Sequence, residues 1–100
     1  MPQVTKWEMQ RFLDNVPEEY IFRCCDGRSI RNLKGLRDTL ADMADNVFAY
    51  HSNQDKSDFS NWVRDIIGDK KLARDLNKAK SRPQALASVE RRLAFLESKI

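Results

Sequence analysis

The sequence predicts a mainly α fold, with about five helices in a small bundle and one short β-hairpin. Apolar residues recur at spacings of three and four in several segments, which is the pattern of amphipathic helices. Only three glycines and three prolines occur in 100 residues, so few positions interrupt a helix. One aromatic-rich run, YIFRCC, is followed by Asp26-Gly27, a dipeptide that favours a tight hairpin turn. We expect residues 1–100 to form a single helical domain, because this length is typical of one domain.

The first helix is predicted over residues 5–15 from the residues at its start. Thr5 and Glu8, three positions apart, can form a capping box in which each side chain accepts from the other residue's backbone N–H. Val4 and Met9 have the spacing of a hydrophobic staple across the same helix start. These signals predict a helix that begins at a defined residue.

Residues 20–25 and 28–30 are predicted to pair as the two short strands of the hairpin. Such a hairpin is marginally stable alone, so we expect it to pack on the helical body. The next helix is predicted to continue without a break from Asn32 to Val47, because one apolar stripe extends along that whole segment. The stripe consists of Leu33, Leu36, Leu40, Met43 and Val47.

Three further helices are predicted in the second half of the chain. The first is capped by Ser57 or Asp58 and ends at Gly68, which can adopt the left-handed conformation of a helix end. The second follows the capping residue Asp69, and the third begins at residues 81–83, Ser-Arg-Pro. Their inward residues are predicted to be Phe59, Trp62, Val63, Ile66 and Ile67, then Leu72, Ala73 and Leu76, then Leu86, Val89, Leu93, Leu96 and Ile100.

No segment of the sequence predicts a membrane span or an export signal. The first residues contain no apolar core region, and nowhere do about 18 consecutive apolar residues occur. The two cysteines, Cys24 and Cys25, are adjacent, so they cannot provide a disulfide framework. We therefore expect a cytoplasmic location and no membrane contact.

The net charge of +3 is unevenly distributed along the chain. Residues 1–68 contain 9 Lys and Arg against 11 Asp and Glu, whereas residues 69–100 contain 9 against 4. A basic C-terminal third fits an acidic partner, although solvated helices rich in Lys and Arg have the same composition. The nine basic residues are Lys70, Lys71, Arg74, Lys78, Lys80, Arg82, Arg91, Arg92 and Lys99.

His51, the one histidine of the chain, stands shortly before the Trp-bearing segment. Asp55 or Asp58 could orient its imidazole toward a nucleophile, which would have to be Cys24 or Cys25. No nucleophile elbow, phosphate loop or paired-carboxylate motif accompanies these residues, so we predict no catalytic residue and no enzyme. One His and two adjacent Cys also supply too few well-placed ligands for zinc, so we predict no metal and no cofactor.

We interpret the surroundings of His51 as a structural joint at the start of the Trp-bearing helix. In this interpretation the histidine packs beside the tryptophan and hydrogen-bonds a loop carbonyl or an acid. The structural joint is predicted to comprise Tyr50, His51, Asp58, Phe59 and Trp62.

Residues 48–73 contain F-x-Y-H, a short polar loop and then D-F-S-x-W-V-x-D-x-x-G-D-x-x-L-A. With D-G-R-x-I-x-N-L-x-x-L over residues 26–36, this run resembles the central motif of a family of small prokaryotic domains of unknown function. The resemblance covers about residues 20–96 and implies a shared fold, with residues 1–19 as an extra N-terminal helix. Because that family has no established activity, the resemblance implies none.

Two aromatic side chains are predicted to point outward from the terminal helices, one on each. Aromatic and Arg side chains are frequent in binding hot spots, which favours a protein partner or self-association. The candidate interaction surface comprises Trp7, Arg11, Arg91, Arg92, Phe95 and Lys99.

The sequence therefore predicts a non-enzymatic interaction domain that binds a protein partner or itself as a homo-oligomer. One alternative is a nucleic-acid-binding module that uses the basic C-terminal helices, with an aromatic ring that stacks on a base between cations. Another alternative is an enzyme centred on His51. The motifs indicate no small-molecule substrate.

Overall fold

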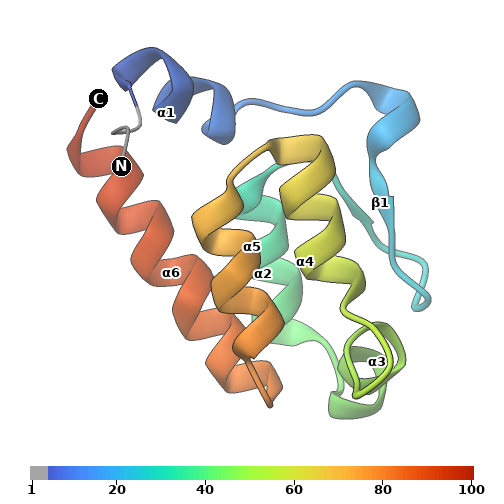
Figure 1. Cartoon of the computed structure of the whole chain (residues 1–100). Helices are drawn as coiled ribbons and strands as arrows, with labels where there is room; N and C mark the ends of the chain where they lie inside the picture. The colour runs from blue at the N-terminus through green and yellow to red at the C-terminus, as the bar shows by residue number, and fades with distance from the viewer. Residues whose placement is uncertain (1–4) are drawn as a thin grey trace.

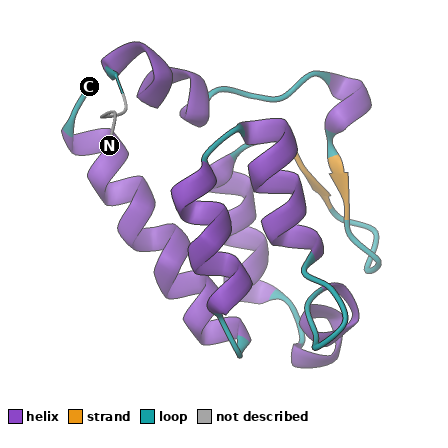
Figure 2. Cartoon of the chain, in the orientation of Figure 1, coloured by secondary structure: helices purple, strands orange, loops and turns teal. Residues whose placement is uncertain are grey.

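Six α-helices surround one hydrophobic core in the computed structural model, which describes residues 5–100 (Figure 1). A short antiparallel hairpin packs at one side of the helices, as Figure 2 shows. The mainly helical fold with one short hairpin is therefore confirmed. No helix within these residues is long and apolar enough to cross a membrane.

Four helices form the body of the fold. They are α2 (Leu33–Asp42), α4 (Asp58–Trp62), α5 (Lys70–Lys78) and α6 (Arg82–Ser98). Helix α6 contacts α2 and α5, and α5 also contacts α4, so α5 lies between α4 and α6 in Figure 1. Helix α1 (Lys6–Leu13) crosses one end of this group and contacts α2 and α6.

The core lies where α2, α4, α5 and α6 face one another. Its residues on α2, and Val89, Leu93 and Leu96 on α6, come from the predicted apolar stripes and are almost completely buried. Burying one such aliphatic side chain contributes about 1.5–3 kcal/mol, so this shared core is the main source of stability. The fully buried members include Leu33, Leu36, Leu40, Phe59, Leu72, Leu76, Val89 and Leu96.

Helix α1 begins with the predicted capping box. The Glu8 N–H donates to Thr5 Oγ1 over 3.1 Å, and the Thr5 N–H donates to Glu8 Oε1 over 3.3 Å. Met9 and Phe12 are buried and fix the inner face of the helix. The predicted staple includes Val4, which lies outside the described residues.

The hairpin forms where it was predicted, with strands of two residues each. Strand β1 (Phe22–Arg23) pairs with β2 (Ser29–Ile30), with Phe22 opposite Ile30. Gly27 in the turn has φ +94°, a conformation that glycine adopts without steric cost. The residues before β1 form a 3₁₀ turn, Glu18–Tyr20, where the sequence predicted the start of the strand.

The helix predicted over residues 32–47 is two helices, so that part of the prediction is wrong. Helix α2 ends at Asp42, and α3 (Asp45–His51) begins after Met43 and Ala44, whose ψ angles of 151° and 152° are extended. The break lets the side chain of Met43 stay buried while α3 leaves the direction of α2.

Arg82, at the start of α6, stabilises the break between α2 and α3. Its Nη1 donates to the carbonyl oxygen of Leu40 over 2.9 Å, and its Nε donates to Asp45 Oδ1 over 2.9 Å. A helix end leaves its last carbonyls without intrahelical partners, so this long-range cap compensates for ending α2 early. Periodicity within residues 32–47 could not reveal a cap from residue 82.

Helix α4 continues as a π-helical turn, Val63–Ile67, before the chain reaches α5. The Gly68 N–H donates to the carbonyl oxygen of Val63 over 2.7 Å, and Gly68 has φ +91°. The predicted glycine stop is therefore present, although the turn before it is wider than an α-helix. Asp69 then caps α5, because its Oδ1 accepts from the Leu72 N–H over 3.2 Å.

The inward face of α6 is rotated from the predicted stripe. Ala85, Ser88 and Arg92 are buried, while Leu86 is only partly buried and Ile100 is exposed. The rotation follows from packing against two helices, because α6 contacts α2 on one flank and α5 on the other. Small residues at positions 85 and 88 suit a close approach of neighbouring helices.

Candidate functional site

His51 is held by two hydrogen bonds in the structural joint and is only 5% exposed. The Cys25 N–H donates to His51 Nε2 over 3.0 Å, and His51 Nδ1 lies 3.0 Å from Asp58 Oδ2. A backbone N–H can only donate, so Nε2 must carry a lone pair. The imidazole is therefore neutral, with its proton on Nδ1 and donated to the Asp58 carboxylate.

Aromatic rings from the hairpin and α4 surround this histidine. The Phe22 ring centroid lies 5.1 Å from that of His51 and 5.1 Å from that of Phe59. Trp62 is also buried, and its indole Nε1 donates to the carbonyl oxygen of Tyr20 over 2.7 Å. The structural joint thus attaches the hairpin to α3 and α4 by one hydrogen bond on each side of β1.

Tyr50 marks the outer edge of the joint, with 61% of its surface exposed. Its ring lies 5.0 Å from the His51 ring, and Lys56 Nζ lies 4.9 Å from its centroid. The same ammonium lies 3.1 Å from Asp58 Oδ2, so the carboxylate has both an imidazole and an ammonium partner.

The His51 imidazole has no free nitrogen for proton transfer. Both ring nitrogens of His51 are occupied, and Cys25 reaches it through its backbone rather than its thiol. Burial raises the pKa of the Cys24 thiol above its ordinary value, which disfavours the reactive thiolate. His51 pairs with Asp58 rather than with Asp55, which is exposed in the loop and whose backbone N–H donates to Asn53 Oδ1 over 2.9 Å.

The part of the chain that the structure describes contains no preformed metal site. Among residues 5–100, no group of three or more His, Cys, Asp or Glu side chains is placed to hold an ion. Within the same residues, no buried side-chain nitrogen or oxygen lacks a hydrogen-bond partner. The polar interior is therefore satisfied by the protein itself.

The candidate interaction surface is divided by the structure. Trp7 is 65% exposed, with the Arg11 guanidinium 5.2 Å from its ring centroid, and Phe95 is 41% exposed. Arg92 does not belong to this surface, because it is only 8% exposed and pairs with Asp69, which is 1% exposed. Two hydrogen bonds join the pair, from Nε to Oδ2 over 2.7 Å and from Nη2 to Oδ1 over 3.0 Å.

The Asp69–Arg92 ion pair is a residue pair that sequence reasoning missed. Helices α5 and α6 pack side by side in opposite directions, which brings the residue before α5 next to the last third of α6 (Figure 1). The sequence predicts Asp69 only as a helix cap. It places Arg92 outward because the predicted apolar stripe on α6 is centred too near Leu86. The small residues Ala85 and Ser88 on the same flank of α6 are the sequence signal that this flank packs against a neighbouring helix.

A basic face lies across α5 and α6, formed by Lys70, Arg74, Lys78 and Arg91. The three α5 residues are spaced by four positions and therefore form one row along the helix, opposite its buried residues. Within residues 5–100, no carboxylate lies within 4.0 Å of these four cationic groups. Three other cations of this part of the chain are paired, namely Lys71 with Asp75, Arg82 with Asp45 and Arg92 with Asp69.

Two shallow grooves follow the sides of α5. The groove toward α4 has a volume of about 380 Å³, and its lining includes Arg64, Lys70 and Arg74. The groove toward α6 has a volume of about 300 Å³, and its lining includes Arg91 and also Asp75, which pairs with Lys71. Lys78 lines both grooves, so the basic face extends over the surface of α5 from one groove to the other.

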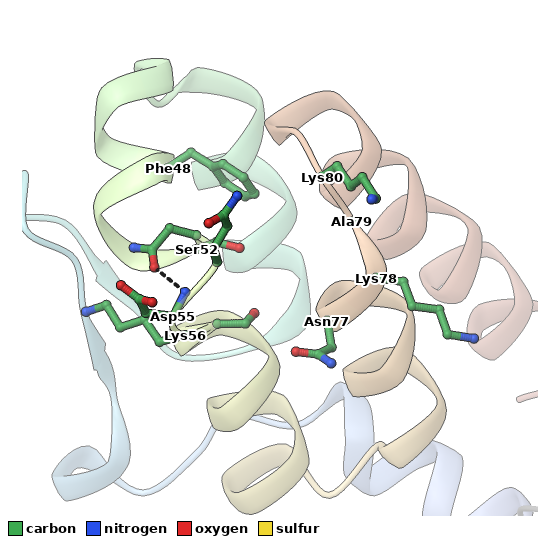
Figure 3. Close-up of a pocket in the computed structure, with 11 residues that line it drawn as sticks. Phe48, Ser52, Asp55, Lys56, Asn77, Lys78, Ala79 and Lys80 are labelled. Atoms are coloured by element: carbon green, nitrogen blue, oxygen red, sulfur yellow. Dashed lines mark hydrogen bonds between the residues drawn. The ribbon is translucent and has the colours of Figure 1, made fainter.

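A separate hollow of about 770 Å³ lies between residues 52–57 and residues 77–80 (Figure 3). The side chain of Asn77 points into it, whereas Lys56 and Lys78 extend away from it on opposite sides. Phe48 contributes to its wall. The hollow is therefore lined by a mixture of neutral polar, charged and apolar residues, and the Lys78 ammonium points away from it.

Comparisons with protein-family models, with curated proteins and with solved structures found no match.

Proposed function

We propose that this chain is a non-enzymatic interaction domain that binds an anionic partner through the basic face. The supporting observation is that four cations without a carboxylate partner among residues 5–100 lie on two packed helices, whereas Lys71, Arg82 and Arg92 on the same helices are paired. Like charges at short range repel one another, and a partner with negative charges relieves that repulsion. The face thus has the charge and the shape to bind an extended anion.

The structural joint supports the non-enzymatic part of the proposal. Its histidine has a partner on each ring nitrogen, and its role is to hold the hairpin. The resemblance of residues 20–96 to small prokaryotic domains remains a proposal about descent, and a cytoplasmic location remains a prediction from the sequence.

The proposal is tested by reversing charge on the basic face. Arg74→Glu/Lys78→Glu should weaken binding to labelled oligonucleotides and to heparin by on the order of ten-fold, because two anion contacts become repulsive. The matched control is Lys6→Glu/Arg31→Glu, which changes the net charge equally at exposed positions away from α5. Fluorescence anisotropy at about 50 and 200 mM salt measures both affinity and salt dependence.

Two results would contradict the proposal. One is a wild-type chain that binds none of these polyanions at the lower salt concentration. The other is a control variant that loses as much affinity as the variant in the basic face, since net charge rather than this surface would then control binding.

A second candidate function, a protein partner or self-association, is supported by Trp7. Tryptophan is highly buried on average, and an indole that is 65% exposed beside Arg11 has the composition of a binding hot spot. We commit to a second copy of the chain as the partner to test. Light scattering during size exclusion should show a dimer that persists as salt rises and that Trp7→Ser disrupts. A monomer at every concentration tested would exclude it.

A further inference from the structure

Resting on the proposed function, we infer that the anionic partner is a single-stranded nucleic acid, with one base stacked on Phe95 while its phosphates contact the basic face. Phe95 is four positions after Arg91 on α6, so the two side chains lie one above the other on the same side of the helix. The exposed ring and the free cations therefore belong to one continuous surface.

The Phe95 ring is supported from inside the protein. The Arg92 guanidinium carbon lies 5.2 Å from the ring centroid, and Arg92 is buried while 41% of Phe95 is exposed. The guanidinium therefore contacts the ring from the protein side, while part of the ring surface stays exposed to solvent. Lys99 Nζ, 5.6 Å from the centroid, is a second cation over the same ring.

The position of the Phe95 ring is fixed by the buried ion pair between Asp69 and Arg92. Asp69 holds Arg92 by two hydrogen bonds and at the same time caps the first turn of α5. The ring is thus located beside the start of α5, where Lys70 begins the row of cations. A ring held in place loses little conformational freedom when a ligand stacks on it.

The combination of a single aromatic ring with a row of cations distinguishes among anions. A base can stack on a protein ring only when it is not stacked within a duplex. A duplex presents phosphates without an available base, and an acidic peptide presents carboxylates without a base. Single-stranded nucleic acid is the class that uses both parts of the surface.

The test compares an oligothymidylate with an abasic strand of equal length, which has the same phosphates and no bases. The wild type should bind the oligothymidylate about five- to one-hundred-fold more tightly, the range expected for stacking of one base. Phe95→Leu should abolish this preference, because leucine covers Arg92 without offering a ring, and Phe95→Tyr should retain it. Arg74→Glu/Lys78→Glu should weaken binding to both strands.

The four possible results are distinguishable. Loss of the preference in Phe95→Leu, with rescue in Phe95→Tyr, supports the inference. Equal binding of the two strands by the wild type overturns it, while weakening by the charge reversal would leave the proposed function intact. A preference that Phe95→Leu keeps also overturns it, since the bases would then contact another site. No binding of either strand, of duplex or of poly-L-glutamate overturns both proposals. Circular dichroism melts check that each variant is folded.

Discussion

The structural joint and the basic face use polar residues in opposite ways. In the joint, His51, Asp58 and the Trp62 indole each have a partner within the protein. On the basic face, none of the four cations has a carboxylate partner within the described residues. Burial explains the difference, because a polar group removed from water without a partner costs about 1–3 kcal/mol, whereas an exposed cation keeps its hydration. The joint therefore stabilises the fold, whereas the basic face keeps exposed cations that can contact the anionic partner we propose.

The largest expected loss of stability is at Asp69, which is buried beneath the basic face. Asp69→Ala should destabilise the protein by about 3–5 kcal/mol, because it leaves the Arg92 guanidinium buried without its counter-ion. Loss of the α5 cap adds about 1 kcal/mol. Urea denaturation measures the change.

Asp69→Ala/Arg92→Met is the matched control, because it removes both charges together. It should recover a large part of the stability. An Asp69→Ala variant as stable as the wild type would show that the ion pair is not what holds α5 against α6.

In the structural joint, Trp62→Ala should cost about 3–5 kcal/mol, because it creates a cavity against Phe22 and removes the donor to the Tyr20 carbonyl oxygen. Trp62→Phe is the matched control, since it keeps a ring and loses only the indole N–H. Thermal and urea unfolding would both report the difference. A Trp62→Ala variant that melts within about two degrees of the wild type would place this side chain outside the core.

His51→Leu should cost about 1–3 kcal/mol, because it leaves the Cys25 N–H without an acceptor and removes one of the two partners of the Asp58 carboxylate. Amide hydrogen exchange at Cys25 should accelerate more than exchange in α6, since the lost bond holds the hairpin. The metal content of the purified wild type and of His51→Leu is measured as well. Stoichiometric zinc in the wild type that disappears in His51→Leu would instead identify the histidine as a ligand.

The sequence predicted those parts of the fold whose causes are local. The capping box at Thr5, the turn at Gly27 and the stop at Gly68 depend on neighbouring residues and could be read from them. The break between α2 and α3 depends on Arg82, which is about forty residues away. Periodicity cannot detect a cap supplied from another helix, so the sequence predicted one helix there.

The same distinction applies to the candidate site. The sequence placed Trp7 and Phe95 outward, and both are exposed. It also placed Arg92 outward, because the angle around one helix does not show which flank a neighbour covers. The row Lys70, Arg74 and Lys78 was visible as a basic third, but which cations stay unpaired depends on the tertiary positions of the acids.

A small acid-dependent effect is expected at the hairpin turn. Hydrogen bonds from the Arg28 guanidinium and then from its N–H lower the pKa of Asp26 from 3.8 to about 2. Because the folded-state pKa is depressed, this contribution to stability is present above about pH 4 and is lost as the pH falls through about 2. Asp26→Asn should remove that dependence. An NMR titration of the carboxyl checks it, and a midpoint near 3.8 would show that the turn does not hold Arg28.

The smallest expected effect on stability is on the basic face itself, where Arg74→Ala/Lys78→Ala should change the free energy of unfolding by less than about 0.5 kcal/mol. Both side chains are exposed and unpaired within the described residues, so their removal breaks no contact and relieves repulsion along α5. The variant should therefore be slightly more stable than the wild type at about 50 mM salt. The difference should shrink near 300 mM, where exposed charges are screened. Urea unfolding at the two salt concentrations measures this, with Lys71→Ala as the control that removes a paired cation. A clear loss of stability in the double variant would mean that these cations contribute to the fold, and the contrast between the two regions would then fail.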